Sequence, residues 1–433
     1  MKAPLVKTAS LSLAALALSQ IALADWTKSY VIEWNEPAMH YGAETGVIDP
    51  GSDCPAGSNP EPDWIQVLVD AGYTEKEARW LRDPSHPFRI PNHGQNQMAF
   101  RGENRQNIYM HPESTPDPGL NPVAGIIGEG LDLDGNLNNG FTSPEGETGI
   151  DNEFYRTLGC WMTYRGPARQ SASALSKNDE MRNGSWTIVI VVAGEGNDPM
   201  NDNNVTVGFY NSKDPMVKDA NGNIARDYTF SIAPDKKFEA IFKAKTIGGD
   251  IISTQAMDEV WMRDPSYTRE LQLLKAKIKL TMQEDGSLTG LVAGYRPWFP
   301  IYRGWVEARG SVIEQLTWVQ LPAVYYALKR NADYRPAGAK DNTHISFALR
   351  VDAIPAYVVT PEADARLAKV VSYKDIAPPS EGRIPAVYFH QLVVDGIVRL
   401  RNGTIPGGPD VEIPPPTNLA VAGDLPSLGE TSK

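Results

Sequence analysis

The sequence predicts a mainly β protein built on an antiparallel β-sandwich core of jelly-roll-like type. Runs rich in β-branched and aromatic residues recur between residues 121 and 300, with turn residues between them. One run, Leu274 to Met282, alternates apolar and polar residues, which is the period of a strand with one buried face. No helical pattern separates the runs, and this favours antiparallel neighbours over a parallel sheet.

Residues 1–24 are predicted to form a signal peptide. Two lysines precede an apolar run at residues 11–18, and Ala22-Leu23-Ala24 forms a small-residue cleavage site before Asp25. The apolar run is too short to span a bilayer as a helix. We therefore expect a mature protein without a membrane span that begins near Asp25 and is periplasmic or secreted.

The chain is acidic, with 41 Lys and Arg against 53 Asp and Glu and a formal net charge of −12. Loss of Lys2 and Lys7 with the signal peptide makes the mature charge more negative by two. A surface of this sign repels nucleic acid but is compatible with divalent cations and with neutral small-molecule or glycan ligands.

Cys54 and Cys160 are the only two cysteines of the chain. An even pair in an exported protein favours a disulfide over two free thiols. The bridge would tie the N-terminal region to the segment that follows Cys160.

Residues 25–120 are rich in Pro, Gly, Asn and His and are predicted to be loop-rich, with one short helical hairpin. Asp63 can cap a first helix at residues 64–71, which Gly72 ends. Thr74 opens a second helix with a capping box, and this helix ends before Asp83-Pro84.

The remaining chain is divided into the β-sandwich at residues 121–300, a mixed α+β segment at 301–401 packed on it, and a Pro- and Gly-rich tail at 402–433 that is predicted to be disordered. The predicted strands are Trp186–Ala193, Val205–Tyr210, Tyr228–Ile232, Phe238–Thr246, Leu274–Met282, Leu288–Tyr295, Ile345–Val351, Ala356–Val359 and Val387–Val394.

The densest polar cluster lies between Glu129 and Asn152, and it predicts a metal site. Its oxygen-bearing side chains on a Gly-rich loop suit a hard cation such as Ca²⁺. The expected ligands are Asp132, Asp134, Asn136, Asn138 and Asp151. The loop resembles the Asp- and Asn-rich loops of calcium proteins in general, but it lacks the EF-hand spacing. The alternative is a set of Asx and Gly turns without metal.

Aromatic residues gather at residues 295–305, and Trp298, Tyr302 and Trp305 are the candidate ligand-binding residues. Flat rings beside polar groups suit a sugar or an extended apolar ligand. If the cluster binds sugar, Glu307 and Glu314 are the nearest carboxylates for acid and base roles. Core packing is the alternative.

His86, His93 and His111 lie in one loop-rich region together with two methionines, a ligand set that copper accepts. None of them has a spacing typical of a metal motif. Hydrogen-bonded or exposed loop histidines are the alternative.

No serine-hydrolase elbow, His-Glu-x-x-His, phosphate-binding loop or Cys-x-x-Cys-His motif is present. The sequence therefore favours an exported calcium-binding β-sandwich protein with a ligand-binding rather than catalytic role. One alternative is a secreted carbohydrate-active enzyme that uses paired carboxylates, because such enzymes leave no short motif. The second alternative is a periplasmic copper-binding protein.

Overall fold

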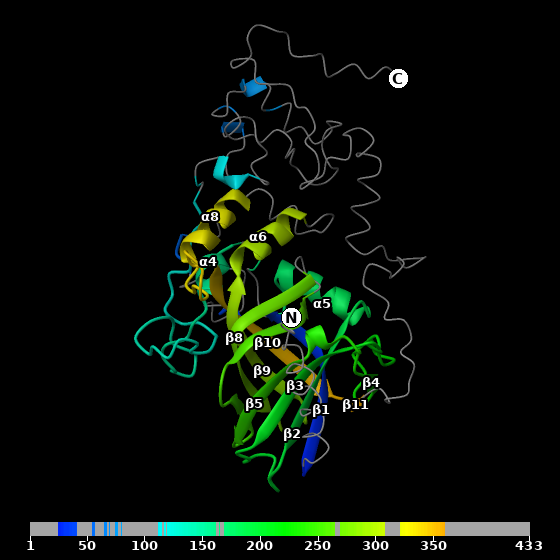
Figure 1. Ribbon diagram of the computed structural model, residues 1–433. Coiled ribbons are helices and arrows are strands. Elements are labelled where there is room, and N and C mark those ends of the chain that lie inside the picture. The colour runs from blue at the N-terminus through cyan, green and yellow to red at the C-terminus, as the bar shows by residue number, and fades with distance from the viewer. Residues whose placement is uncertain are drawn as a thin grey trace, which may run out of the picture.

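The computed structural model describes residues 25–40, 54–56, 111–114, 119–161, 169–264, 269–307 and 321–359, and nine further residues: Ile65, Gln66, Val69, Thr74, Glu75, Lys76, Arg79, Asp117 and Tyr164. Figure 1 shows that these residues form one β-structure with helices gathered near one end of it. The mainly β, antiparallel prediction is confirmed.

Nine strands of the described chain make up the main sheet. They are β1 (Trp26–Pro37), β2 (Thr187–Gly194), β3 (Val205–Ser212), β5 (Ala240–Ile247), β6 (Asp250–Ser253), β7 (Met257–Asp264), β8 (Arg269–Met282), β9 (Leu288–Pro297) and β10 (His344–Pro355). Their order is β6-β5-β3-β2-β1-β10-β9-β8-β7, every neighbouring pair is antiparallel, and β6 also pairs with β8. A separate parallel pair joins β4 (Thr229–Ser231) to β11 (Tyr357–Val359).

The sequence predicts a sandwich, but the sheet is closed: the β6–β8 pairing joins eight of its strands into a barrel. Strand β8 is long enough to take two partners along one edge. Its first half, Arg269 to Ala276, pairs with β7, and its second half, Lys279 to Thr281, pairs with β6. Alternation of apolar and polar residues is common to sandwiches and barrels, so it could not separate the two.

Most of the strands expected between residues 186 and 295 are present with small shifts of their ends. Strand β1 was not expected, because it lies in the region that the sequence marks as loop-rich. Its buried Asn35 and Glu36 hide the usual apolar pattern of a strand. The barrel combines strands from three of the four predicted segments of the mature chain, residues 25–120, 121–300 and 301–401.

The alternation predicted for Leu274 to Met282 is interrupted by a β-bulge. The pairing of β8 with β9 shifts register between Leu274 and Lys277, and Lys275 has a φ of 52°. The extra residue reverses the side-chain direction. Leu273 and Ala276 are therefore both buried, and Leu274 packs instead on the outer face of the sheet.

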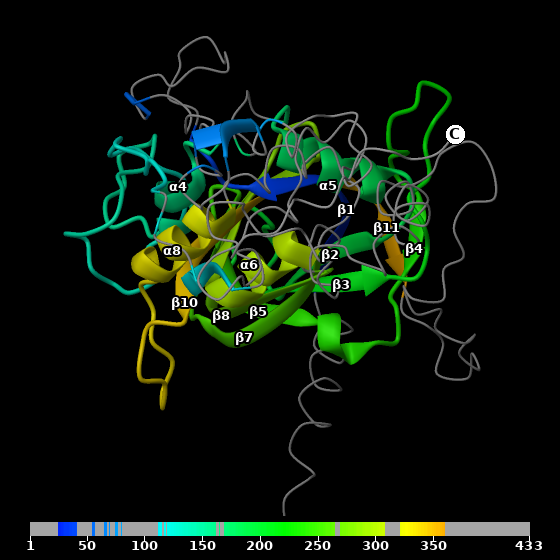
Figure 2. The same ribbon diagram turned by 90° about the horizontal axis from the view of Figure 1, so that it is seen from above.

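Four helices are described over their full length: α4 (Glu153–Leu158), α5 (Ala172–Arg182), α6 (Trp298–Glu307) and α8 (Leu321–Asn331). Two 3-10 turns in the same part of the chain lie at Pro112–Ser114 and Lys236–Phe238. Figure 2 shows α6 and α8 side by side across the strands. They pack through aromatic rings, with the Trp298 and Tyr325 centroids 5.4 Å apart. No described helix has both the length and the apolar character needed to cross a membrane.

The predicted disulfide is confirmed, because Cys54 and Cys160 are bridged. Cys160 lies just after α4 and is fully buried. Of the predicted helical hairpin, the described residues near Ile65 and near Glu75 are helical, and Glu75 pairs with Arg79 one turn later.

Candidate metal centre

The structure brings together three of the five predicted metal ligands. Asp132, Asp134 and Asp151 each offer an oxygen atom, and these atoms all lie within 4.8 Å of one another. An antiparallel bridge between Leu131 and Asp151 joins the two ends of the loop, and the Asp151 amide donates to the Leu131 carbonyl at 3.1 Å. This bridge explains how residues nineteen positions apart converge.

The loop also contains the Asx turns of the alternative interpretation. Asp151 Oδ2 accepts hydrogen bonds from the amides of Leu133, at 2.7 Å, and Asp134, at 3.2 Å. Asp132 Oδ1 accepts from Gly135 N at 2.6 Å. Turn chemistry and clustered carboxylates therefore coexist, and in the described structure the second oxygens of Asp132 and Asp151 accept no hydrogen bond.

Asn136 and Asn138 contribute to the same run of turns. Asn136 Oδ1 accepts from Asn138 N at 3.1 Å, while Asp134 Oδ1 accepts from Asn136 N at 2.7 Å. The Asn136 oxygen is thus already used inside the loop. A ligand role for these two asparagines stays a prediction.

The electrostatics of the site centre on Asp151, which is only 7% exposed. Burial raises the pKa of Asp151 to about 6, the two amide donors oppose this shift, and the charges of Asp134 and Asp132 add to it. Among the described groups that shift this pKa, none carries a positive charge that would compensate the carboxylate. A cation bound among the three carboxylates would supply that charge.

The loop is fixed to the outer face of the barrel by apolar and charged contacts. Leu131 and Leu133 pack with Ala293 and Tyr295 of β9. From the next strand, Lys277 Nζ donates to the Asp132 carbonyl at 2.6 Å, and Lys279 pairs with Glu147. The cluster is consequently presented on a rigid strand surface.

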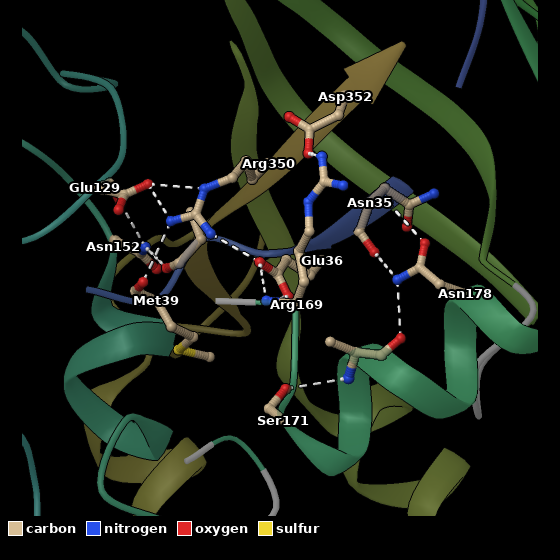
Figure 3. Close-up of polar contacts among 12 residues, drawn as sticks. Asn35, Glu36, Met39, Glu129, Asn152, Arg169, Ser171, Asn178, Arg350 and Asp352 are labelled. Carbon is tan, nitrogen blue, oxygen red and sulfur yellow. Dashed lines mark hydrogen bonds and ion pairs between the residues drawn. The ribbon is translucent and has the colours of Figure 1, made fainter. Parts of the chain in front are cut away.

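A charged network, which we call the Arg350 network, holds both ends of the loop (Figure 3). It consists of Arg350 on β10, Glu36 on β1, Glu129 at the start of the loop and Asn152 at its end. Arg350 Nη1 donates to Glu36 Oε1 at 2.8 Å, and its Nη2 and Nε atoms both donate to Glu129 Oε2. Glu36 is 1% exposed and the Arg350 side chain 20%, so the carboxylate is buried and the guanidinium is partly buried.

Asn152 connects the network to α4 and positions Asp151 beside it. Its Nδ2 atom donates to the carbonyls of Ala38, at 2.9 Å, and Glu129, at 2.7 Å. Its Oδ1 atom caps α4 by accepting from Tyr155 N at 3.1 Å. One buried amide thereby ties barrel, loop and helix together.

Glu36 also accepts from the backbone of Arg169, whose φ of 65° is unusual for a residue other than glycine. The Arg169 guanidinium pairs with Asp352 (Figure 3). It also lies over the Trp34 ring. Burial raises the pKa of Glu36, and the Arg350 charge only partly opposes this. Removal of one charged partner from the Arg350 network should therefore lower the stability of the folded protein.

Further along β1, the side-chain amide of Asn178 on α5 makes the backbone hydrogen bonds that a neighbouring strand would make. Asn178 Oδ1 accepts from Asn35 N at 2.8 Å, and its Nδ2 donates to the Asn35 carbonyl at 2.7 Å (Figure 3). The β1–β2 pairing ends at Val31, so this amide satisfies the backbone beyond it.

The aromatic candidates Trp298, Tyr302 and Trp305 lie on α6 and are 8%, 2% and 2% exposed. They belong to the main hydrophobic core, as the packing alternative expects. Their ligand-binding role stays a prediction. Glu314 and the side chain of Glu307 lie outside the described residues.

Among the histidines proposed for copper, only His111 lies in the described part of the chain. It is exposed, and its Nδ1 atom is 3.4 Å from Glu113 Oε1. His86 and His93 lie outside the described residues.

Sequence reasoning missed Glu36 and Arg350, which are separated by 314 positions. The signal in the sequence was a charged residue inside a strand pattern at each position, but no local pattern indicates that the two residues pair with each other.

Comparison of the chain with protein-family models, curated protein sequences and solved structures finds no match. The interpretation of the site therefore depends on its own geometry.

Proposed function

We propose that this is an exported calcium-binding protein with a binding rather than catalytic role. Its Ca²⁺ ion is held by Asp132, Asp134 and Asp151 on the outer face of the barrel. The observation that carries the proposal is the convergence of these carboxylates within 4.8 Å. Carboxylate oxygens are the ligands that hard cations prefer, and calcium tolerates the irregular geometry of a loop.

The chemistry of the site favours calcium over the softer metals. Its donors are oxygens alone, without the imidazole or thiolate that copper and zinc sites use. Backbone carbonyls, of which the loop has many, complete calcium sites in other proteins. Export is supported by the Cys54–Cys160 bridge, since such bridges persist in oxidising compartments.

Thermal unfolding of the purified protein with calcium or with chelator tests the proposal. A ligand that binds only the folded state stabilises it by about 2.7 kcal/mol at a hundredfold excess over its Kd. We expect calcium to raise the melting temperature of the wild type and to leave Asp134→Asn unchanged. An unchanged wild-type melting curve in chelator contradicts the proposal.

Asp219→Asn is the matched control. Asp219 makes the same kind of turn, accepting from the amides of Asn221, at 2.8 Å, and Asn223, at 2.9 Å. It belongs to no group of carboxylates that could hold a metal in the described structure. This variant should keep the full calcium-dependent shift, so loss of the shift in Asp134→Asn alone identifies the ion site.

A further inference from the structure

Three Asn-Gly pairs lie in the described part of the chain: Asn139-Gly140, Asn183-Gly184 and Asn221-Gly222. In such a pair the glycine nitrogen can attack the side-chain carbonyl of the asparagine, since glycine has no Cβ to hinder it. The pairs differ in what their glycine amides do. Gly184 N–H donates to the Met181 carbonyl at 2.9 Å, and Gly222 N–H donates to the Asp219 carbonyl at 3.0 Å. Gly140 N–H has no acceptor among the described residues.

We propose that Asn139 is a site of spontaneous deamidation in the folded protein. Base removes the Gly140 amide proton, the nitrogen attacks Cγ of Asn139, and the C–N bond to the side-chain amide breaks with release of ammonia. Water then opens the five-membered succinimide at either carbonyl and leaves aspartate or isoaspartate. The net reaction consumes one water molecule and releases one ammonia, with no oxidant or reductant.

A hydrogen bond at the glycine amide opposes this reaction in two ways. It must be broken before the nitrogen loses its proton, and it fixes the nitrogen in the direction of its acceptor. Gly184 and Gly222 carry this protection, whereas Gly140 does not. Of three chemically equivalent Asn-Gly pairs in the described chain, the fold therefore leaves Asn139-Gly140 as the one most open to deamidation.

The product changes the charge balance of the acidic loop. Asn139 Nδ2 donates to Asp134 Oδ2 at 2.9 Å, and deamidation replaces this donor by a carboxylate. An attractive contact becomes a repulsive one beside Asp132 and Asp151. The isoaspartate form also inserts a methylene before Gly140, where even an added Cβ would stand 2.3 Å from the Ile150 carbonyl oxygen. Modification at this position would thus loosen the turn that gathers the carboxylates.

Peptide mapping by mass spectrometry tests the proposal on the purified full-length chain. The protein is incubated folded at mildly alkaline pH in heavy-oxygen water, which labels only the residues that react during the incubation. Asn139 should deamidate about fivefold faster than Asn183 and Asn221, the factor that one net hydrogen bond provides. In denaturant the three rates should become similar, because the protecting bonds are lost.

Asn139→Gln is the control for assignment, since the longer side chain would have to close a less favourable six-membered ring. This variant should abolish the fast labelled product and leave labelling at Asn183 and Asn221 unchanged. Labelling of Asn139 in the folded protein that is equal to or slower than labelling of Asn221 overturns the proposal. This readout is independent of whether the loop binds calcium.

Discussion

Replacing Arg350 with methionine keeps most of the aliphatic stem but leaves Glu36 buried without its cation. Breaking a buried ion pair from one side costs about 3–5 kcal/mol, because the remaining charge is uncompensated. Glu36 is 1% exposed and lies 2.8 Å from the partly buried Arg350, so most of this cost applies to the Glu36 contact. The side chain of Glu129 is 25% exposed, and its arm adds about 0–1 kcal/mol. We expect a loss of about 4 kcal/mol at neutral pH.

The deficit should depend on pH in a defined direction. Burial already raises the pKa of Glu36 above its ordinary value of 4.5, and loss of Arg350 raises it further. A carboxyl whose pKa is higher in the folded state favours folding below its unfolded pKa, and this contribution is lost as the pH rises through the folded pKa. The Arg350→Met deficit should therefore shrink in acid.

Urea unfolding at neutral and acidic pH measures both quantities. Adding Glu36→Gln to Arg350→Met should recover most of the lost stability, because no buried charge remains. Arg226→Met is the matched control, since Arg226 lies 3.7 Å from the exposed Asp285 and should cost under about 1 kcal/mol. A neutral-pH loss for Arg350→Met no larger than that of the control would refute the reasoning.

Three further outcomes follow from the structure. The Cys54→Ser and Cys160→Ser double variant should lose about 4–5 kcal/mol in denaturant unfolding, and thiol titration of the denatured, unreduced wild type should find no free thiol. Trp305→Ala should cost about 3–5 kcal/mol as a core truncation, whereas Phe299→Ala, at a ring that is 49% exposed, should cost under about 1 kcal/mol; equal losses would contradict the core assignment. In chelator, wild-type stability should fall as the pH rises from about 4 to about 6, and Asp151→Asn should reduce this slope, because burial raises the pKa of Asp151 to about 6 and makes its charged form unfavourable when folded; the raised pKa values of Asp333 and Glu36 account for the slope that remains.

The strands could be predicted from the sequence wherever the side-chain pattern is local. Leu274 to Met282 shows the period directly, and only the bulge at Lys275 disturbs it. Barrel closure could not be predicted, because it depends on a short pairing between β6 and the far half of β8. Nothing in four residues at Asp250–Ser253 specifies that partner.

For the candidate site as well, residues of one loop could be predicted to lie together, whereas a pair that is distant in sequence could not. Asp132, Asp134 and Asp151 were predictable, since they belong to one loop rich in Asp, Asn and Gly. The pair between Glu36 and Arg350 joins opposite ends of the described chain, and each looks in sequence like an ordinary solvated charge. Their burial follows from the placement of β1 beside β10.

That placement has a consequence for how the protein reaches its native state. Strand β1 lies between β2 and β10, with Tyr30 opposite both Ile190 and Pro355. Of the described strands, β1 is the first to leave a ribosome or a translocation channel, and its second edge is covered only after β10 has emerged. Such a high contact order predicts slow folding, and a chain shortened before His344 would leave the edges of β1 and β9 open to pairing with other molecules.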